Sequence, residues 1–388
     1  MKRPRGFGVV ACRWVVGLAC VGSVACGGGG DDGPTHEEEE SLVQACPADI
    51  ATVLFDRLPV AATAINEVIV FGELDPGGDD VIPNNQSGIR LNGQGVPLVA
   101  PGNVTVVGVR SSTFTVSPFR QGETDFGLII RPCSEATATF LHVISLVPKF
   151  ADLLAGAVCS DYSTDSETVH DCKIEGLEIA VTSGEALGTV GGATAGGFDF
   201  DMHDTRSVAS VTARANDLYK NAVCFSRYYD ATNRALLESR TGLLGVVRTG
   251  EPACGSIEVD VPGTAQGVWV KASNPVPYDG GADNYLTLAP HFLDPDNRQD
   301  IAIGGTSPIL EDFVRGVART NRDFEQLTED GLLYCYSNGG TTTRSYFVRL
   351  NAGQQLTLEV KTHAPGVTPC LDAPGTWAFS GAAVAYIR

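Results

Sequence analysis

The sequence predicts a mainly β protein with two β-rich domains. Three observations support this. The 388 residues include 45 Gly and only 2 Met, and Gly together with abundant Val, Thr and Ala favours strands and tight turns over long helices. Short apolar or alternating runs recur between turn residues along the chain. Apolar residues make up 43% and charged residues 19%, the balance of a folded chain long enough for two domains.

Residues 1–26 are predicted to be a signal peptide. They carry four basic residues, no acid, and an apolar stretch from Trp14 to Ala25 that is too short to span a bilayer as a mature helix. Removing these four positive charges takes the formal charge from -19 to -23. Such an acidic chain is not attracted to phosphate backbones or anionic headgroups, so nucleic acid is a poor candidate partner.

The signal ends in Ser23-Val24-Ala25-Cys26, and small residues directly before a cysteine resemble the lipobox of bacterial lipoproteins. The resemblance implies that Cys26 is diacylated and becomes the new N-terminus, although Cys20 offers a competing site. Residues 27–45, rich in Gly and acids, form the flexible tether that a lipid anchor needs. We therefore expect an exported protein, anchored by lipid to the bacterial cell membrane and either periplasmic or on the cell surface. A freely secreted chain is the alternative.

Eight cysteines remain once Cys12 and Cys20 leave with the signal and Cys26 takes the lipid. An even number in an exported chain suggests disulfides. Pairing of neighbours along the chain gives Cys159–Cys172, Cys224–Cys254, Cys335–Cys370 and Cys46–Cys133, although sequence alone does not fix the connectivity.

The first domain, residues 46–205, reads as short strands separated by turns. The predicted strands lie at 96–106, 125–132, 138–146, 181–191 and 197–204.

Four of these segments, in order, resemble the β-sheet core of lysostaphin/LytM-type zinc endopeptidases, which cut peptidoglycan cross-links. The family's PVYAP strand matches residues 97–101, and its YAHLS strand matches 140–145, where this chain is one residue longer and keeps the histidine as His142. Its GQxIGxxG turn matches 184–191, and its HLHFEV strand matches 197–202. The resemblance covers about a third of the chain and implies a degenerate lysostaphin-type β-sheet core.

The zinc ligands that the resemblance implies are replaced. The two His and the Asp that bind the ion fall on Gln86, Asp199 and Arg90, and the family's other histidine of HLH falls on Gly197. An open catalytic zinc site needs about three N, S or carboxylate donors. Because Arg has no lone pair to give, we expect zinc to be lost and the domain to be a non-catalytic pseudoenzyme. His142 is then either a remnant of the hydrolase or an ordinary half-buried strand residue.

A rearranged metal site is the competing hypothesis. The period of two places Asp199, Asp201 and His203 on one face of a strand, where His142 could approach from a neighbouring strand. A polar edge beside a core face of Phe198, Phe200 and Met202 explains the same alternation.

The second domain, residues 206–388, is expected to be a β-sandwich or small barrel. A helix at 211–225 leads into it, and a hairpin joins 346–350 to 356–360. Residues 308–327 fit either a helix or an extended loop. Residues 294–300 fit either a calcium loop or a polar turn, and Trp269 and Trp377 fit either a carbohydrate platform or a β core. Further strands are expected at 254–263, 267–271, 285–289 and 383–387.

These inferences predict a cell-envelope lipoprotein whose zinc-less, endopeptidase-like domain binds peptidoglycan or an envelope protein. An active peptidoglycan metallo-endopeptidase with a rearranged site and a structural surface or adhesion protein are the alternatives. No phosphate loop, nucleotide fingerprint or Ser-His-Asp order stands out in the sequence.

Overall fold

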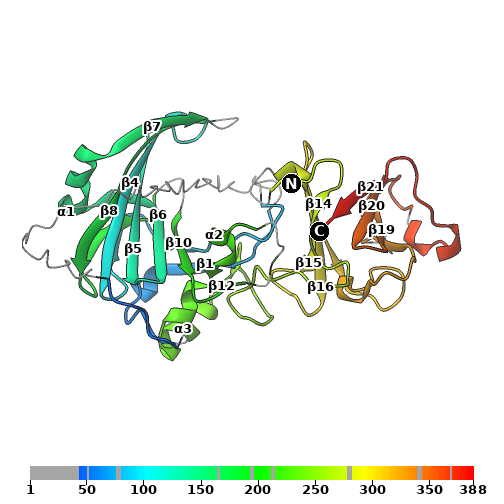
Figure 1. The fold of residues 1–388 in the computed structure, drawn as a ribbon, viewed down its shortest axis with the longest axis horizontal. Coiled ribbons are helices and arrows are strands. Elements are labelled where there is room, and N and C mark those ends of the chain that lie inside the picture. The colour runs from blue at the N-terminus through cyan, green and yellow to red at the C-terminus, as the bar shows by residue number, and fades with distance from the viewer. Residues whose placement is uncertain are drawn as a thin grey trace, which may run out of the picture.

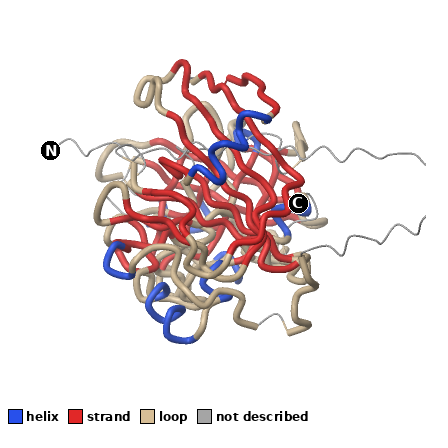
Figure 2. Tube along the Cα trace, turned by 90° about the vertical axis from the view of Figure 1, so that its left-hand side faces the viewer, coloured by secondary structure: helices blue, strands red, loops and turns tan. Residues whose placement is uncertain are grey.

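Two β-sheets lie side by side along the long axis of the molecule (Figure 1), and strands dominate the trace (Figure 2). The protein is mainly β, as the sequence predicts. The computed structural model describes residues 43–49, 52–75, 80–163, 167–192, 196–209, 211, 215–277, 282–338, 343–367 and 369–388. The predicted signal peptide with Cys26, and all but the last few residues of the tether, lie outside this range. In the part of the chain that is described, no helix combines the length and apolarity needed to cross a bilayer.

Thirteen strands form the first sheet, in the order β13-β12-β1-β2-β10-β6-β5-β4-β8-β7, with β3, β9 and β11 paired alongside. The strands predicted at 125–132, 138–146 and 197–204 are confirmed. The strands are β1 (Ile65–Ile69), β2 (Gly88–Leu91), β3 (Val96–Val99), β4 (Val104–Val116), β5 (Thr124–Cys133), β6 (Ala136–Leu146), β7 (Val158–Ser163), β8 (Thr168–Val181), β9 (Ala186–Val190), β10 (Gly197–Asp204), β11 (Ala222–Val223), β12 (Thr241–Leu243) and β13 (Val246–Val247).

Strand β10 shows how the sequence sets the two faces of this sheet. Phe198, Phe200 and Met202 enter the first hydrophobic core, because alternate residues of a strand point to the same face. The Phe200 ring stacks on Phe225, with centroids 4.5 Å apart, and burial of a side chain of this size contributes about 2–3 kcal/mol. Asp199 and Asp201 therefore point to the opposite face.

The helical segments are short. α3 is the longest of those described and is capped by Asp230, whose carboxylate accepts hydrogen bonds from the N–H groups of Thr232 and Asn233. The segments are η1 (Ala62–Ala64), α1 (Pro148–Ala151), η3 (Asp152–Gly156), α2 (Asp217–Lys220), η4 (Phe225–Tyr228), α3 (Ala231–Glu238), η5 (Ala282–Asn284), η6 (Phe324–Gln326), η8 (Pro369–Leu371) and η9 (Pro374–Thr376).

The first sheet continues past residue 205, where the sequence suggested a domain boundary. β12 pairs in parallel with β1, and Phe225, Tyr229 and Leu237 complete the first core. The helix expected at 211–225 is wrong: only α2, four residues long, and the strand β11 are found among its described residues. Of the spaced residues, Ala215 and Ala222 are buried whereas Leu218 is 39% exposed, so the helical spacing identified only part of the buried set.

Eight strands form the second sheet, in the order β17-β16-β15-β14-β21-β20-β19-β18. A bridge between Thr320 and Cys335 links the chain after β17 to β18, so the sheet is nearly closed and barrel-like, as expected. The strands are β14 (Gly267–Lys271), β15 (Tyr285–Pro290), β16 (Arg298–Ile303), β17 (Ile309–Val314), β18 (Tyr334–Tyr336), β19 (Arg344–Asn351), β20 (Gln355–Thr362) and β21 (Val384–Ile387).

The hairpin predicted across residues 351–355 is confirmed by the pairing of Leu350 with Leu356. Residues 308–327 were expected to form either a helix or an extended loop. The start of this segment forms the strand β17, and Phe313 of this strand is buried in the second core. Residues 254–263 contain no strand, contrary to expectation. Trp269 is 1% exposed and belongs to that core, so it cannot serve as a carbohydrate platform.

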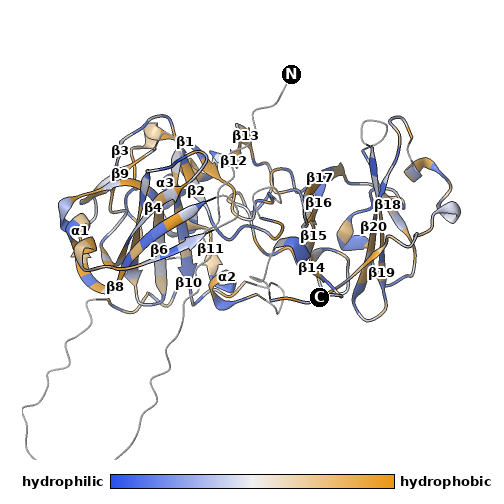
Figure 3. Ribbon diagram, turned by 90° about the horizontal axis from the view of Figure 1, so that it is seen from above, coloured by the Kyte–Doolittle hydropathy of each residue, from blue (hydrophilic) through white to orange (hydrophobic). Residues whose placement is uncertain are grey.

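A third hydrophobic core joins the two sheets. Phe71 and Tyr219 lie in segments that flank strands of the first sheet, and they pack in one cluster with Val270 and Tyr285 of the second sheet. Figure 3 shows the loops that carry part of this cluster between the sheets. Because the two sheets share buried apolar surface, we expect them to hold a defined arrangement.

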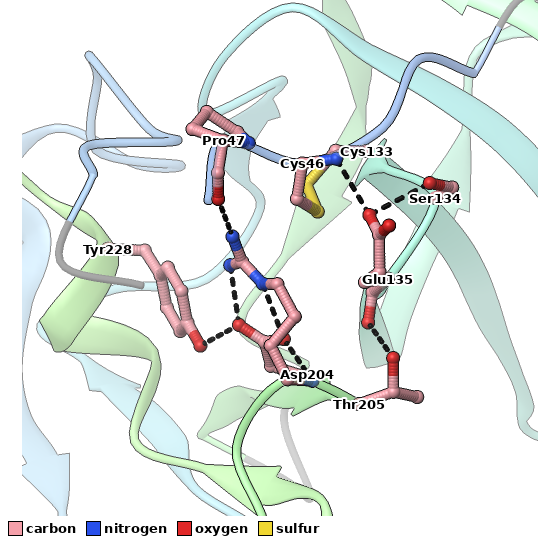
Figure 4. Close-up of a disulfide and its surroundings, with 9 residues drawn as sticks. Cys46, Pro47, Cys133, Ser134, Glu135, Asp204, Thr205 and Tyr228 are labelled. Carbon is pink, nitrogen blue, oxygen red and sulfur yellow. Dashed lines mark hydrogen bonds and ion pairs between the residues drawn. A yellow bond between two sulfur atoms is a disulfide. The ribbon is translucent and has the colours of Figure 1, made fainter. Parts of the chain in front are cut away.

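Three of the four predicted disulfides are present: Cys46–Cys133, Cys159–Cys172 and Cys335–Cys370. The first ties the N-terminal segment to β5, where the Cys46 N–H also donates to Glu135 at 2.7 Å (Figure 4). The predicted Cys224–Cys254 bridge is not formed. The two residues are free thiols, and Cys224 Sγ lies 3.2 Å from Oγ of Ser226.

Candidate functional site

A β-bulge in β6 presents His142. In the pairing of β6 with β5, Phe126 lies opposite Val143 and Leu128 opposite Phe140, so Leu141 and His142 together face the single residue Gly127. His142 has φ 59°, in the left-handed region, as the extra residue of a bulge often does. The bulge turns the imidazole toward carboxylates on the two neighbouring strands.

Two carboxylates hold the His142 ring. Its Nδ1 lies 2.9 Å from Oδ2 of Asp125 on β5, and its Nε2 lies 3.4 Å from Oδ2 of Asp199 on β10. Burial alone would lower the pKa of His142, but the charge of Asp199 and the hydrogen bonds to both carboxylates outweigh it and raise the pKa to about 10. At neutral pH the ring is therefore an imidazolium with both N–H groups directed at carboxylates.

Asp201 lies deeper on the same strand and is 4% exposed. Its carboxylate accepts hydrogen bonds from the Ser87 N–H at 3.0 Å and from Gln86 Nε2 at 3.3 Å. Burial, and then the charge of Asp199, raise the pKa of Asp201 well above its usual value. Gln86 thus acts as a donor to a carboxylate.

Arg90 lies on β2 beside a second acidic group. Its Nε is 3.5 Å from Oε1 of Glu67 on β1, and Glu67 also accepts from the backbone N–H groups of Leu244 and Gly245. Burial and the neighbouring acids raise the pKa of Glu73 to about 7, while the charge of Arg90 opposes that rise. The positive charge of Arg90 therefore balances the negative charges of the acidic groups around it on this face of the sheet.

The structure brings the sequence-predicted positions onto one sheet face. Arg90 pairs with Gly197 and Gly88 pairs with Asp199, and residues directly opposite in antiparallel strands point the same way. Asp199 contacts His142, whereas Gln86 contacts Asp201. The positions share a face, but they do not converge on one point.

Among the described residues, His203 does not join Asp199 and His142 in one cluster of possible ligand atoms. His203 is four residues from Asp199 along an extended strand, about 13 Å away. Its pKa is lowered to about 4 by burial. A metal ion would need at least three ligand atoms from His, Cys, Asp or Glu close together. In the described ranges, every group of three such atoms within 4.8 Å of one another contains disulfide cysteines. His142 belongs to none of these groups.

A small pocket of about 50 Å³, open to solvent, adjoins His142. Arg120 lines it, with Nη1 3.2 Å from Asp125 and Nη2 3.2 Å from Glu167. The Arg120 guanidinium carbon lies 3.5 Å from the centre of the Phe114 ring, and Tyr162 of β7 lines another wall.

Opposite charges thus alternate through Asp199, His142, Asp125, Arg120 and Glu167. Sequence reasoning missed Asp125, Arg120 and Glu167 as site residues. They are scattered over more than 40 positions, and strand pairing alone brings them together.

Comparison with protein-family models, with curated proteins and with solved structures finds no match to this chain.

Proposed function

We propose that the protein is a cell-envelope lipoprotein whose first sheet carries a non-catalytic, endopeptidase-like domain that binds a cell-wall component. The observation that carries the proposal is the ion-paired His142. It stands where the resemblance places the family histidine, yet both of its nitrogens face carboxylates.

The residues at the family's zinc positions do not fit the ion. Gln86 donates its amide N–H to Asp201, and Arg90 is cationic and paired with Glu67. Only Asp199 offers a charged oxygen, and that oxygen faces the His142 imidazolium. One carboxylate is too few for an open zinc site, so no bound water would be activated for hydrolysis.

The small pocket beside His142 suits one polar side group of a bound peptide, with the rest of the peptide lying outside it. Arg120 and Asp125 offer a donor and an acceptor, while Tyr162 offers a ring surface. Pockets that combine apolar walls with a few placed polar groups are the usual form of ligand sites. The peptide stems of peptidoglycan have this mixed character and lie within reach of an anchored envelope protein.

Co-sedimentation of the full mature chain with purified peptidoglycan tests the proposal. We expect binding without release of soluble peptides, whether zinc or a chelator is added. Tyr162→Ala should weaken binding about tenfold, whereas Leu371→Ser, at a side chain 80% exposed in the second half of the chain, should have no effect.

Two results would overturn the proposal. Peptide release that a chelator abolishes would favour the active metallo-endopeptidase. Absence of binding to peptidoglycan would favour a structural surface or adhesion protein.

A further inference from the structure

Strands β7 and β8 form an exposed ribbon at the edge of the first sheet (Figure 1). In this ribbon Cys159 pairs with Cys172, and Asp161 pairs with His170. Residues two apart on a strand share a face. The four side chains therefore form a square that offers two sulfurs, an imidazole and a carboxylate.

The His170 ring is turned toward the sulfurs. Its Nδ1 lies 2.7 Å from Oδ1 of Asp161, and its Nε2 lies 3.3 Å from Sγ of Cys172. The ligand atoms of Cys159, His170 and Cys172 all lie within 4.8 Å of one another. A histidine held by a carboxylate through one nitrogen, with the other nitrogen facing the ligand position, is the usual arrangement in metal sites.

The square faces solvent. The side chains of His170 and Asp161 are 47% and 71% exposed, while Tyr162 and Val169 line the pocket on the other side of the ribbon. A reductant can therefore reach the Cys159–Cys172 bond. Six backbone pairs hold the ribbon, and the two cysteine Cα atoms are 4.0 Å apart, so the sulfurs stay close after reduction.

We propose that reduction of Cys159–Cys172 by a dithiol turns this ribbon into a site for a thiophilic cation such as Zn²⁺. The dithiol passes two electrons and two protons to the bond and becomes a disulfide itself. Cys159 and Cys172 then release two protons to solvent as they bind the ion as thiolates. His170 supplies the third ligand, and Asp161 is a positioning residue.

The donor set matches zinc chemistry. Two thiolates and an imidazole are typical protein ligands, and sulfurs bound at about 2.3 Å in a tetrahedron lie about 3.8 Å apart. Opening the disulfide requires only a short separation of the sulfurs. The site is independent of the His142 centre, so either proposal can fail alone.

Zinc titration of the full mature chain against a chromogenic chelator tests the inference. The chain is compared with its disulfides intact and after reduction with a phosphine that is then removed without oxygen. Reduction should create a site that is absent from the Cys159→Ser/Cys172→Ser variant. Affinity should fall at least tenfold in His170→Ala and about tenfold in Asp161→Asn.

Other cysteines require matched controls. Cys224→Ser/Cys254→Ser removes the free thiols, and Glu135→Gln changes the other cysteine cluster that includes an acid. Neither variant should alter the zinc site. Cobalt should give a thiolate charge-transfer band in the reduced wild type and lose it in Cys159→Ser/Cys172→Ser. Equal zinc affinity in wild type and His170→Ala, or no gain on reduction, would overturn the inference.

Discussion

The Nε2 atom of His142 lies 3.4 Å from Oδ2 of Asp199, although the two residues are far apart in sequence. Asp125 holds the opposite nitrogen of the ring at 2.9 Å. The imidazolium of His142 balances the charges of the two carboxylates, so all three groups have partners without a metal ion.

Replacing His142 with Ala should destabilise the fold by about 3 kcal/mol at pH 6, because two half-buried carboxylates lose their counter-charge. The pKa of His142 in the folded chain, about 10, exceeds its ordinary value of 6.5. The stabilisation is therefore fully present below pH 6.5 and is lost as pH rises through 10. Denaturant unfolding at pH 6, 8 and 10 measures it.

The control for this change is His170→Ala, whose side chain is 47% exposed. Its effect should stay below about 0.5 kcal/mol at each pH. If the His142→Ala variant equalled wild type at pH 6, the ion-paired centre would be refuted.

Asp300 should make the protein less stable as pH rises from acid to neutral values. It is 1% exposed and lies beside His291, and burial raises its pKa to about 8. The unfolded chain loses this proton near pH 4 while the folded chain keeps it, so stability falls as pH rises from about 4 to 8. Asp300→Asn should raise the free energy of unfolding at pH 8 by roughly 2 kcal/mol or more.

The gain from Asp300→Asn should shrink toward pH 4. Asp372→Asn, at an exposed position, serves as the control and should change nothing at either pH. A pH-independent effect of Asp300→Asn would show that the buried carboxylate is not the cause.

Gly127→Ala tests the bulge that presents His142. An added Cβ would lie 3.0 Å from Cδ2 of Leu141 and 3.3 Å from the Phe140 carbonyl oxygen, so the bulged residues must shift. We expect a loss of about 1–2 kcal/mol in thermal or denaturant unfolding. Gly156→Ala, whose Cβ would meet nothing within 4 Å, should be nearly neutral. Equal effects of the two changes would refute a tightly packed bulge.

Cys224 and Cys254 should react as free thiols in a thiol titration. We expect two thiols in the denatured, unreduced mature chain, and, because each thiol is close enough to influence the pKa of the other, we expect a mild oxidant to couple them. Thiol titration before and after oxidation measures this. Absence of thiols before oxidation would favour the fourth disulfide that pairing along the sequence suggested.

Local pattern predicted much of the fold. Alternation in 197–204 identified β10 and its two faces, and the hairpin across 351–355 followed from two short runs flanking a turn. The sequence pattern gave the wrong secondary structure where contacts between distant segments determine the conformation. Residues 211–225 have helical spacing, but the third core uses Ala215 and Tyr219 in a largely irregular segment.

The candidate site was predictable only in part. His142 and Asp199 were found through resembling motifs, since each lies within a recognisable strand. Asp125, Arg120 and Glu167 belong to no motif. The local sequence cannot predict an ion pair between residues such as Arg120 and Glu167, which are 47 positions apart. The strand β6 was visible in sequence, but the bulge that presents its histidine depends on the φ of 59° at His142.

Zinc analysis of the mature chain with its disulfides intact tests the central claim most directly. After exposure to zinc and gel filtration, we predict no bound zinc that depends on the His142 centre, because its imidazolium and Arg90 offer no lone pair. One zinc ion per chain, lost from both the Asp199→Ala and His142→Ala variants, would contradict the account.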